Sequence, residues 1–158
     1  MAGSYTQIPR KVGGSRAVGD FRYKLYRAAI LQLNKAFEQE FYIEATMISD
    51  SIINDRLEAR IQYLYKDEPH QRVSSISTGN ALVQLRNLED IEPLNKIYDE
   101  VNNWVVKRNI VAHSFVKYQD VGTPLTSIQR FSQGKITAVE GKKLMRKLSN
   151  AVKRYNNY

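Results

Sequence analysis

Residues 41–65 read FYIEATMISDSIINDRLEARIQYLY, and this stretch decides the fold class. Its apolar residues recur every three or four positions, the period of a helix with one apolar face; they are Ile53, Leu57, Ile61 and Leu64, with Ile48 and Ile52 widening the stripe. No glycine or proline occurs from Asp20 to Glu68. We therefore expect two long helices in residues 20–68, with a boundary near Glu40 and an end before Pro69.

The rest of the chain continues the helical pattern. A shorter helix is predicted over about 77–88, a long one from about Asp90 to about Tyr118, and a last one to about Arg154. Thr137 and Glu140 fit a capping box that would open the last helix. Residues 127–137, which include Gly134, are compatible with a short β-hairpin before it. The predicted fold is all-α, a small antiparallel helical bundle of about five helices with this optional hairpin.

Length and composition narrow the class of protein further. The 158 residues predict a Gly-rich, basic, flexible N-terminal tail over 1–19 and a single helical domain over 20–158. The absence of cysteine excludes disulfides and cysteine nucleophiles, and His70 and His113 lie far apart, so we expect no metal ion or other cofactor. No apolar run exceeds four residues, which predicts a cytoplasmic protein with no membrane partner.

Charge is distributed unevenly along the chain. Residues 1–27 carry a net +5 and residues 130–158 a net +7, whereas the intervening part carries −4. Clustered Lys and Arg at the two ends are suited to a polyanion such as a nucleic acid, because they release counterions from its phosphates. Charge alone is equally compatible with ends that only keep the protein soluble.

The segment KRNIVAHSF, residues 107–115, places polar residues in a run that otherwise reads as a buried helix. On a helix Asn109 and His113 are one turn apart, so the amide could orient the imidazole, while Arg108 is turned about 140° from His113. A second copy related by a two-fold axis could bring two such Arg–His sets onto one substrate.

This combination of residues is suited to phosphodiester chemistry. Arg108 would hold and neutralise the phosphate, with Lys107 and Lys117 as further RNA-binding residues. Imidazole ordinarily exchanges a proton near neutral pH, so His113 would move the proton of a ribose 2′-OH or of the leaving 5′-oxygen.

RNIVAH, near the end of the fourth predicted helix, resembles the Arg-x4–6-His motif of the HEPN superfamily, and EATMISDSIINDRLEARI is similar in character to the second helix of several HEPN-like groups. The resemblance implies a homodimeric, metal-independent endoribonuclease that cuts single-stranded RNA, in which Arg108, Asn109 and His113 are catalytic. By analogy with the superfamily, it also implies a toxin–antitoxin or antiphage defence setting, with an antitoxin or regulatory protein as a possible partner.

One position departs from the pattern. In HEPN toxins paired with a nucleotidyltransferase antitoxin, a tyrosine two residues after the histidine is modified, and here that position is Phe115. The resemblance therefore does not imply control by nucleotide transfer at this position. A second group, similar to the mannitol-operon repressor, shares the helical fold without the nuclease role. It leaves open a non-catalytic HEPN-like module that binds nucleic acid or a protein partner.

Purely structural roles compete with these assignments. His113 could be a core histidine, and Arg108 a surface cation near a helix C-terminus. Asp50, Asp55 and Glu58 could be acid partners of the motif, although solvated or salt-bridged acids are more usual on such a helix. Two tyrosines among the basic residues of the C-terminal end could stack on bases or simply fray with the end: Tyr155 and Tyr158.

Overall fold

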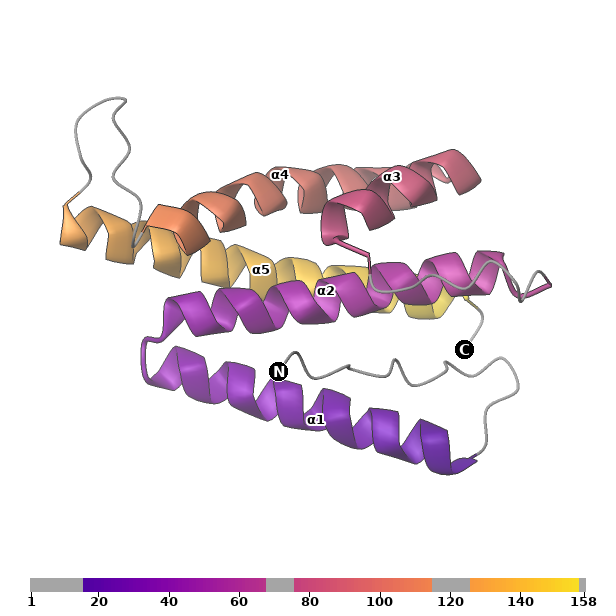
Figure 1. The fold of residues 1–158 in the computed structure, drawn as a ribbon, viewed down its shortest axis with the longest axis horizontal. Helices are drawn as coiled ribbons and strands as arrows, with labels where there is room; N and C mark the ends of the chain where they lie inside the picture. Colours follow the sequence, from indigo (N-terminus) through magenta and orange to yellow (C-terminus); the bar gives the residue numbers. More distant parts are fainter. Residues whose placement is uncertain (1–15, 68–75, 115–125, 157–158) are drawn as a thin grey trace, which may run out of the picture.

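The computed structural model describes residues 16–67, 76–114 and 126–156, with the backbone alone described for residues 16–20, 22 and 114. Five helices account for nearly all of this part, and no strand occurs in it: α1 Arg16–Glu38, α2 Tyr42–Leu64, α3 Thr78–Leu88, α4 Glu92–Ser114 and α5 Ser127–Tyr155 (Figure 1). The predicted all-α bundle is confirmed. Helix α1 begins four residues earlier than the predicted start of the domain at residue 20.

Helix α2 is the centre of the bundle and packs against each of the other four helices. Figure 1 shows α2 and α5 across the middle, α1 along one side, and α3 and α4 along the other. Tyr42 packs on Phe131, while Arg60 near the other end of α2 contacts Asn156, so α2 and α5 run in the same direction. Helices α1 and α4 run antiparallel to these two, as their contacts Tyr26–Arg56 and Lys107–Glu140 indicate.

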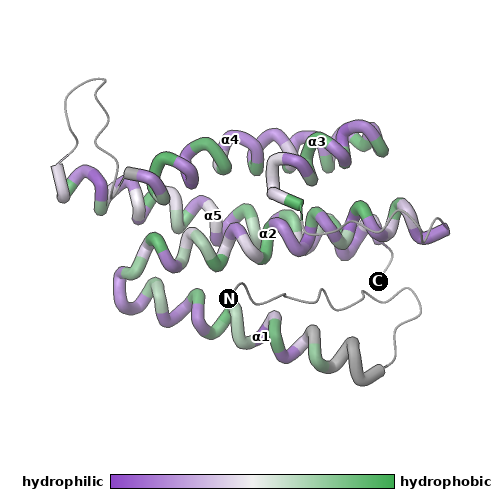
Figure 2. The backbone as a smooth tube through the Cα atoms, viewed as in Figure 1, coloured by the Kyte–Doolittle hydropathy of each residue, from purple (hydrophilic) through white to green (hydrophobic). Residues whose placement is uncertain are grey.

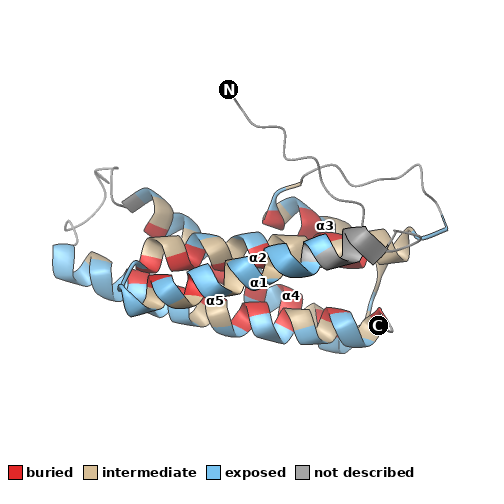
Figure 3. Cartoon of the chain, turned by 90° about the horizontal axis from the view of Figure 1, so that it is seen from below, coloured by how far each residue is buried: buried red, intermediate tan, exposed pale blue. Residues whose placement is uncertain are grey.

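The core follows the predicted apolar stripe. Ile53, Leu57 and Ile61 are fully buried, as are Tyr98 and Trp104 of α4. Apolar and polar segments alternate along the helices, and buried and exposed segments do the same (Figures 2 and 3). Burial of one face of each helix removes apolar area from water, which is the main driving force for this fold.

Helix α1 ends at Glu38, and the turn into α2 is centred on Glu40, near which the sequence predicts the boundary between the two helices. The N–H of Phe41 donates to the carbonyl of Ala36 at 2.8 Å, and that of Glu40 donates to the carbonyl of Phe37 at 3.1 Å. Glu40 has a φ of 57°, so the turn is a Schellman motif with a glutamate at the position that glycine usually occupies. This hydrogen-bonding pattern ends α1 and turns the chain back into α2.

The predicted hairpin is wrong, because residues 127–137 form the first three turns of α5. The capping box is at Thr126 and Gln129, each side chain bonding the other residue's backbone N–H, and not at Thr137 and Glu140. Gly134 lies within the helix and is buried against Tyr42, where a Cβ would make an ordinary contact at 3.7 Å. The cap fixes the first turn as helix, and burial of Gly134 and Thr137 on α2 extends it.

Helices α4 and α5 meet at Trp104. Its indole Nε1 donates to the carbonyl of Thr137 at 2.8 Å. A Cβ placed on Gly141 would lie 2.5 Å from Cζ2 of the indole, closer than any real contact. Only glycine therefore fits at residue 141 without a shift of one helix. This contact fixes the middle of α4 against the middle of α5.

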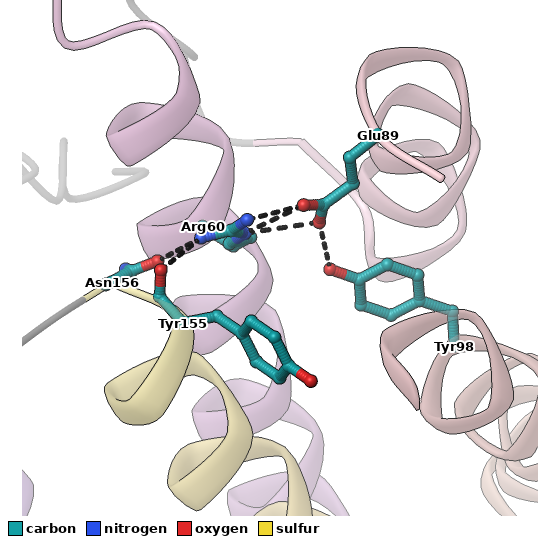
Figure 4. A network of polar contacts seen from close by, with 5 residues as sticks. All are labelled: Arg60, Glu89, Tyr98, Tyr155 and Asn156. Carbon is teal, nitrogen blue, oxygen red and sulfur yellow. Dashed lines mark hydrogen bonds and ion pairs between the residues drawn. The ribbon is translucent and has the colours of Figure 1, made fainter. Parts of the chain in front are cut away.

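A buried polar network fastens the opposite end of the bundle (Figure 4). Arg60, 4% exposed, donates to both carboxylate oxygens of Glu89, to Oδ1 of Asn156 at 2.8 Å and to the carbonyl of Tyr155 at 2.9 Å. The hydroxyl of Tyr98 donates to Glu89 at 2.7 Å. Burial, followed by the hydrogen bond to Glu89, raises the pKa of Tyr98 far above its usual range. The network joins α2, α4, α5 and the end of α3.

Candidate functional site

The predicted catalytic residues lie in the last two turns of α4. Helix α4 packs against both α2 and α5. Trp104 of α4 lies against Gly141 of α5 and holds these two helices together. The helical period turns Arg108 and His113 to different sides of α4, about 140° apart. The structure follows this geometry, since Arg108 is mostly buried and His113 is exposed.

Arg108 points towards α2. Its Nη2 lies 3.0 Å from Oδ1 of Asp50, and the side chains of the two residues are 19% and 17% exposed. The hydroxyl of Thr78 donates to the same Asp50 oxygen at 3.2 Å. The Nε of Arg108 is buried and has no hydrogen-bond partner among the residues that the structure describes. Asp50 therefore orients the guanidinium and neutralises its charge at low solvent exposure.

Asn109 contacts Arg108 and not His113. Its Oδ1 accepts a hydrogen bond from Nη1 of Arg108 at 2.7 Å. The predicted orientation of the imidazole by this amide is therefore not seen in the described part of the chain. His113 lies in the last turn of α4, where the helix dipole favours positive charge.

The outward side of α4 combines the histidine with apolar residues. Val106 is 57% exposed and Ile110 is 46% exposed, and with His113 they follow steps of four and three residues along one stripe. The two aliphatic side chains form a small exposed apolar face next to the imidazole. The sequence pattern does not reveal this stripe, because Ile110 stands in a run that resembles a buried helix.

The other predicted site residues have separate environments. Lys107 is exposed and forms an ion pair with Glu140 of α5, with 2.9 Å to each oxygen of the carboxylate. Lys117, the second predicted RNA-binding residue, lies outside the described residues, as do Phe115, His70 and Tyr158. Tyr155 is half-buried and packs against the core.

The three acidic side chains of α2 that the sequence singled out have different partners. Asp50 is the residue that joins the site, and Asp55 forms an ion pair with its neighbour Arg56 at 2.6 Å. Glu58 is buried and accepts a hydrogen bond from Asn54. Of the three acids considered from the sequence, Asp50 contacts the motif on α4 through Arg108.

The described residues contain neither a candidate metal site nor a membrane-spanning helix. No group of three or more His, Cys, Asp or Glu side chains that could hold a metal ion occurs in residues 16–67, 76–114 and 126–156. In the same ranges, every helix is too short or too polar to cross a bilayer. Comparison with family models, with curated proteins and with solved structures gives no match.

Proposed function

We propose that this protein is a metal-independent endoribonuclease of HEPN type, which cuts single-stranded RNA as a homodimer. The observation that carries the proposal is the arrangement at the end of α4, where Asp50 fixes Arg108 and His113 is open to solvent. A restrained guanidinium beside an accessible imidazole provides the two groups that RNA cleavage requires: one that binds phosphate and one that transfers a proton.

The cleavage step balances without a cofactor. The ribose 2′-oxygen attacks the adjacent phosphorus, and its proton goes to a histidine. The bond from phosphorus to the 5′-oxygen breaks, and that oxygen takes up a proton. The products are a 2′,3′-cyclic phosphate and a 5′-hydroxyl. Arg108 stabilises the negative charge that develops on the phosphorane oxygens, because its N–H groups donate to them in the transition state.

The homodimer follows from the directions of the two side chains. Arg108 faces α2 and His113 faces outward, so one chain does not direct both at the same phosphate. The stripe of Val106, Ile110 and His113 offers an apolar face to a second copy. Across a two-fold axis, His113 of one chain reaches the phosphate held by Arg108 of the other. A defence or toxin–antitoxin role remains an analogy with the HEPN superfamily.

The test is cleavage of end-labelled single-stranded RNA in EDTA. We expect wild-type protein to cleave, and Arg108→Ala or His113→Ala to reduce the rate by about 10²-fold or more. The double variant is expected to be hardly slower than the slower single variant, because both groups act on one transition state. Asn109→Ala should cost less, since Asn109 contacts Arg108 and transfers no proton.

A second function is favoured by one specific observation. Arg108 and Lys107 are already paired with Asp50 and Glu140, so their charges are partly neutralised before any substrate binds. Because paired cations attract phosphate less strongly, this favours a non-catalytic HEPN-like module, which would hold nucleic acid or an acidic partner through other cations. RNA binding by wild-type protein without any cleavage in EDTA or in Mg²⁺ would favour the module over the enzyme.

A further inference from the structure

Four cationic residues lie along one side of α5 and form what we call the α5 ridge: Lys135, Lys142, Arg146 and Lys153. Steps of seven, four and seven residues keep them within about 40° around the helix and spread them over about 27 Å along its axis. Lys135, Arg146 and Lys153 are exposed, and Lys142 is half-buried.

The α5 ridge carries positive charge that no acidic side chain of residues 16–67, 76–114 and 126–156 pairs with. Lys147, on the side of α5 that faces α4, is instead paired with Glu100 at 2.5 Å. Glu140 is the single acidic residue of α5, and residues 141–158 contain none. Because the described acidic side chains leave this charge unpaired, this side of the helix is attractive to an anion.

Lys142 is the ridge residue whose charge is disfavoured by its surroundings. Its Nζ donates to Oδ1 of Asn34 at 2.9 Å and lies 4.7 Å from the ring centroid of Phe37, so it is held between α5 and α1. Burial, followed by repulsion from Arg146, lowers the pKa of Lys142. A bound anion would offset the repulsion and stabilise the charged form.

Aromatic rings accompany the cations. Phe131 is 45% exposed and packs edge-on against Tyr42, whose ring centroid lies 5.9 Å from Nζ of Lys135. On α1, Tyr23 is 65% exposed and shares one side of the helix with the exposed Arg27 and with Asn34. Figure 3 shows exposed segments on both α1 and α5 in the view from below.

We propose that the α5 ridge binds the phosphate backbone of single-stranded RNA, with the rings of Phe131 and Tyr23 available to stack on bases. Cations at intervals along a helix track a backbone of regularly spaced phosphates, and exposed rings favour unpaired bases over an acidic protein. The choice of RNA as the polyanion rests on the proposed function. The ridge lies on the α1 side of α5 and is separate from the end of α4, which lies on the other side of α2 and α5.

The experiment measures binding in a His113→Ala background, so that the RNA is not cut. The ridge variant is Lys135→Gln/Arg146→Gln/Lys153→Gln. The control, Lys66→Gln/Arg86→Gln/Lys96→Gln, removes the same charge from exposed side chains on other helices or their ends. The probe is a fluorescent single-stranded RNA of about 20 nucleotides, longer than common single-strand site sizes. Both variants are first checked for an unchanged thermal melt.

We expect the ridge variant to bind about ten-fold or more weakly at 50 mM salt, with the slope of log K against log salt reduced by about 2, as for three lost phosphate contacts. The control should stay within about three-fold of the parent. Equal weakening by the two variants would overturn the proposal. So would ridge-dependent binding of polyglutamate but not of RNA, which would identify an acidic protein partner.

The outcomes for the two proposals are separable. If the ridge variant loses RNA binding but wild-type protein never cleaves RNA, the ridge proposal stands and the ribonuclease proposal fails. If wild-type protein cleaves RNA and the ridge substitutions change neither binding in the His113→Ala background nor cleavage in a wild-type background, the ribonuclease proposal stands and the ridge proposal fails.

Discussion

At the scale of single residues, Arg108 is the position where the structure adds most to the sequence. The helical period predicts that Arg108 and His113 point in different directions, and the structure follows it. The partner of Arg108 could not be predicted in the same way. Asp50 lies on another helix, and no local spacing distinguishes it from Asp55 or Glu58, so its pairing with Arg108 depends on how α2 and α4 pack.

The ion pair between Arg108 and Asp50 means that Arg108 contributes more to the stability of the fold than His113 does. Arg108→Ala should lower the free energy of unfolding by about 1–3 kcal/mol, because it leaves the mostly buried carboxylate of Asp50 with Thr78 as its remaining partner. His113→Ala, at an exposed position, should change it by less than about 0.5 kcal/mol. Urea denaturation of both variants measures the difference.

Asp50→Asn is the matched control, because it retains the shape of the side chain and removes its charge. It should destabilise the protein about as much as Arg108→Ala, since it leaves the guanidinium with little solvent and no counter-charge. A large stability loss from His113→Ala, with Arg108→Ala close to wild type, would instead make the histidine the structural residue.

At the scale of elements, the amphipathic period predicted every helix, but not where the last one begins. Ile128, Phe131 and Ile136 alternate loosely enough to fit a strand or a helix, and Gly134 suggested a turn. All three apolar residues are exposed in the structure, although Phe131 packs edge-on against the buried Tyr42, so their spacing does not mark a buried face. The start of α5 is set by the cap at Thr126 and by contacts with α2, which an isolated pattern does not contain.

The turn between α1 and α2 carries strain that a substitution can remove. Glu40→Gly should raise the free energy of unfolding by about 0.5–1 kcal/mol, because glycine adopts the φ of 57° without the steric cost that a Cβ carries. The control is Glu38→Gly in the last turn of α1, which should lower stability by about as much. If the two glycines have the same sign of effect in urea denaturation, the turn is not a Schellman motif.

The crossing of α4 and α5 provides a second matched pair of variants. Gly141→Ala should destabilise by about 1–3 kcal/mol, because its Cβ would overlap the fully buried ring of Trp104. Gly134→Ala meets Tyr42 at an ordinary 3.7 Å and should be neutral or stabilising by up to about 1 kcal/mol. Thermal melts and tryptophan fluorescence report both effects. Equal tolerance of the two alanines would contradict the packing at Trp104.

At the scale of the whole molecule, the Arg60 network joins parts of the chain that are distant in sequence. Glu89→Gln should cost about 3–5 kcal/mol, because it leaves the buried guanidinium of Arg60 without its counter-charge. Tyr98→Phe removes one hydrogen bond to Glu89 and should cost about 1–2 kcal/mol. Urea unfolding measures both, and a smaller loss for Glu89→Gln than for Tyr98→Phe would show that the ion pair is not the main tie.

The whole molecule also decides whether Arg108 and His113 act together. The chain holds Arg108 against α2 and presents His113 outward, so the proposed activity requires two chains. The sequence predicted this requirement through the 140° offset of the two positions. The exposure of Val106 and Ile110 beside His113 depends on the fold, because α2 and α5 cover other sides of α4.

The most direct measurement is cleavage of labelled single-stranded RNA by an equilibrated mixture of Arg108→Ala and His113→Ala chains in EDTA. Each variant alone should be slower than wild type by about 10²-fold or more. A mixed dimer contains one site with Arg108 from one chain and His113 from the other. With half of the dimers mixed and one intact site in each, the mixture should recover about a quarter of the wild-type rate. A mixture no faster than either variant alone, beside an active wild type, would contradict the shared site, and an inactive wild type would contradict the ribonuclease itself.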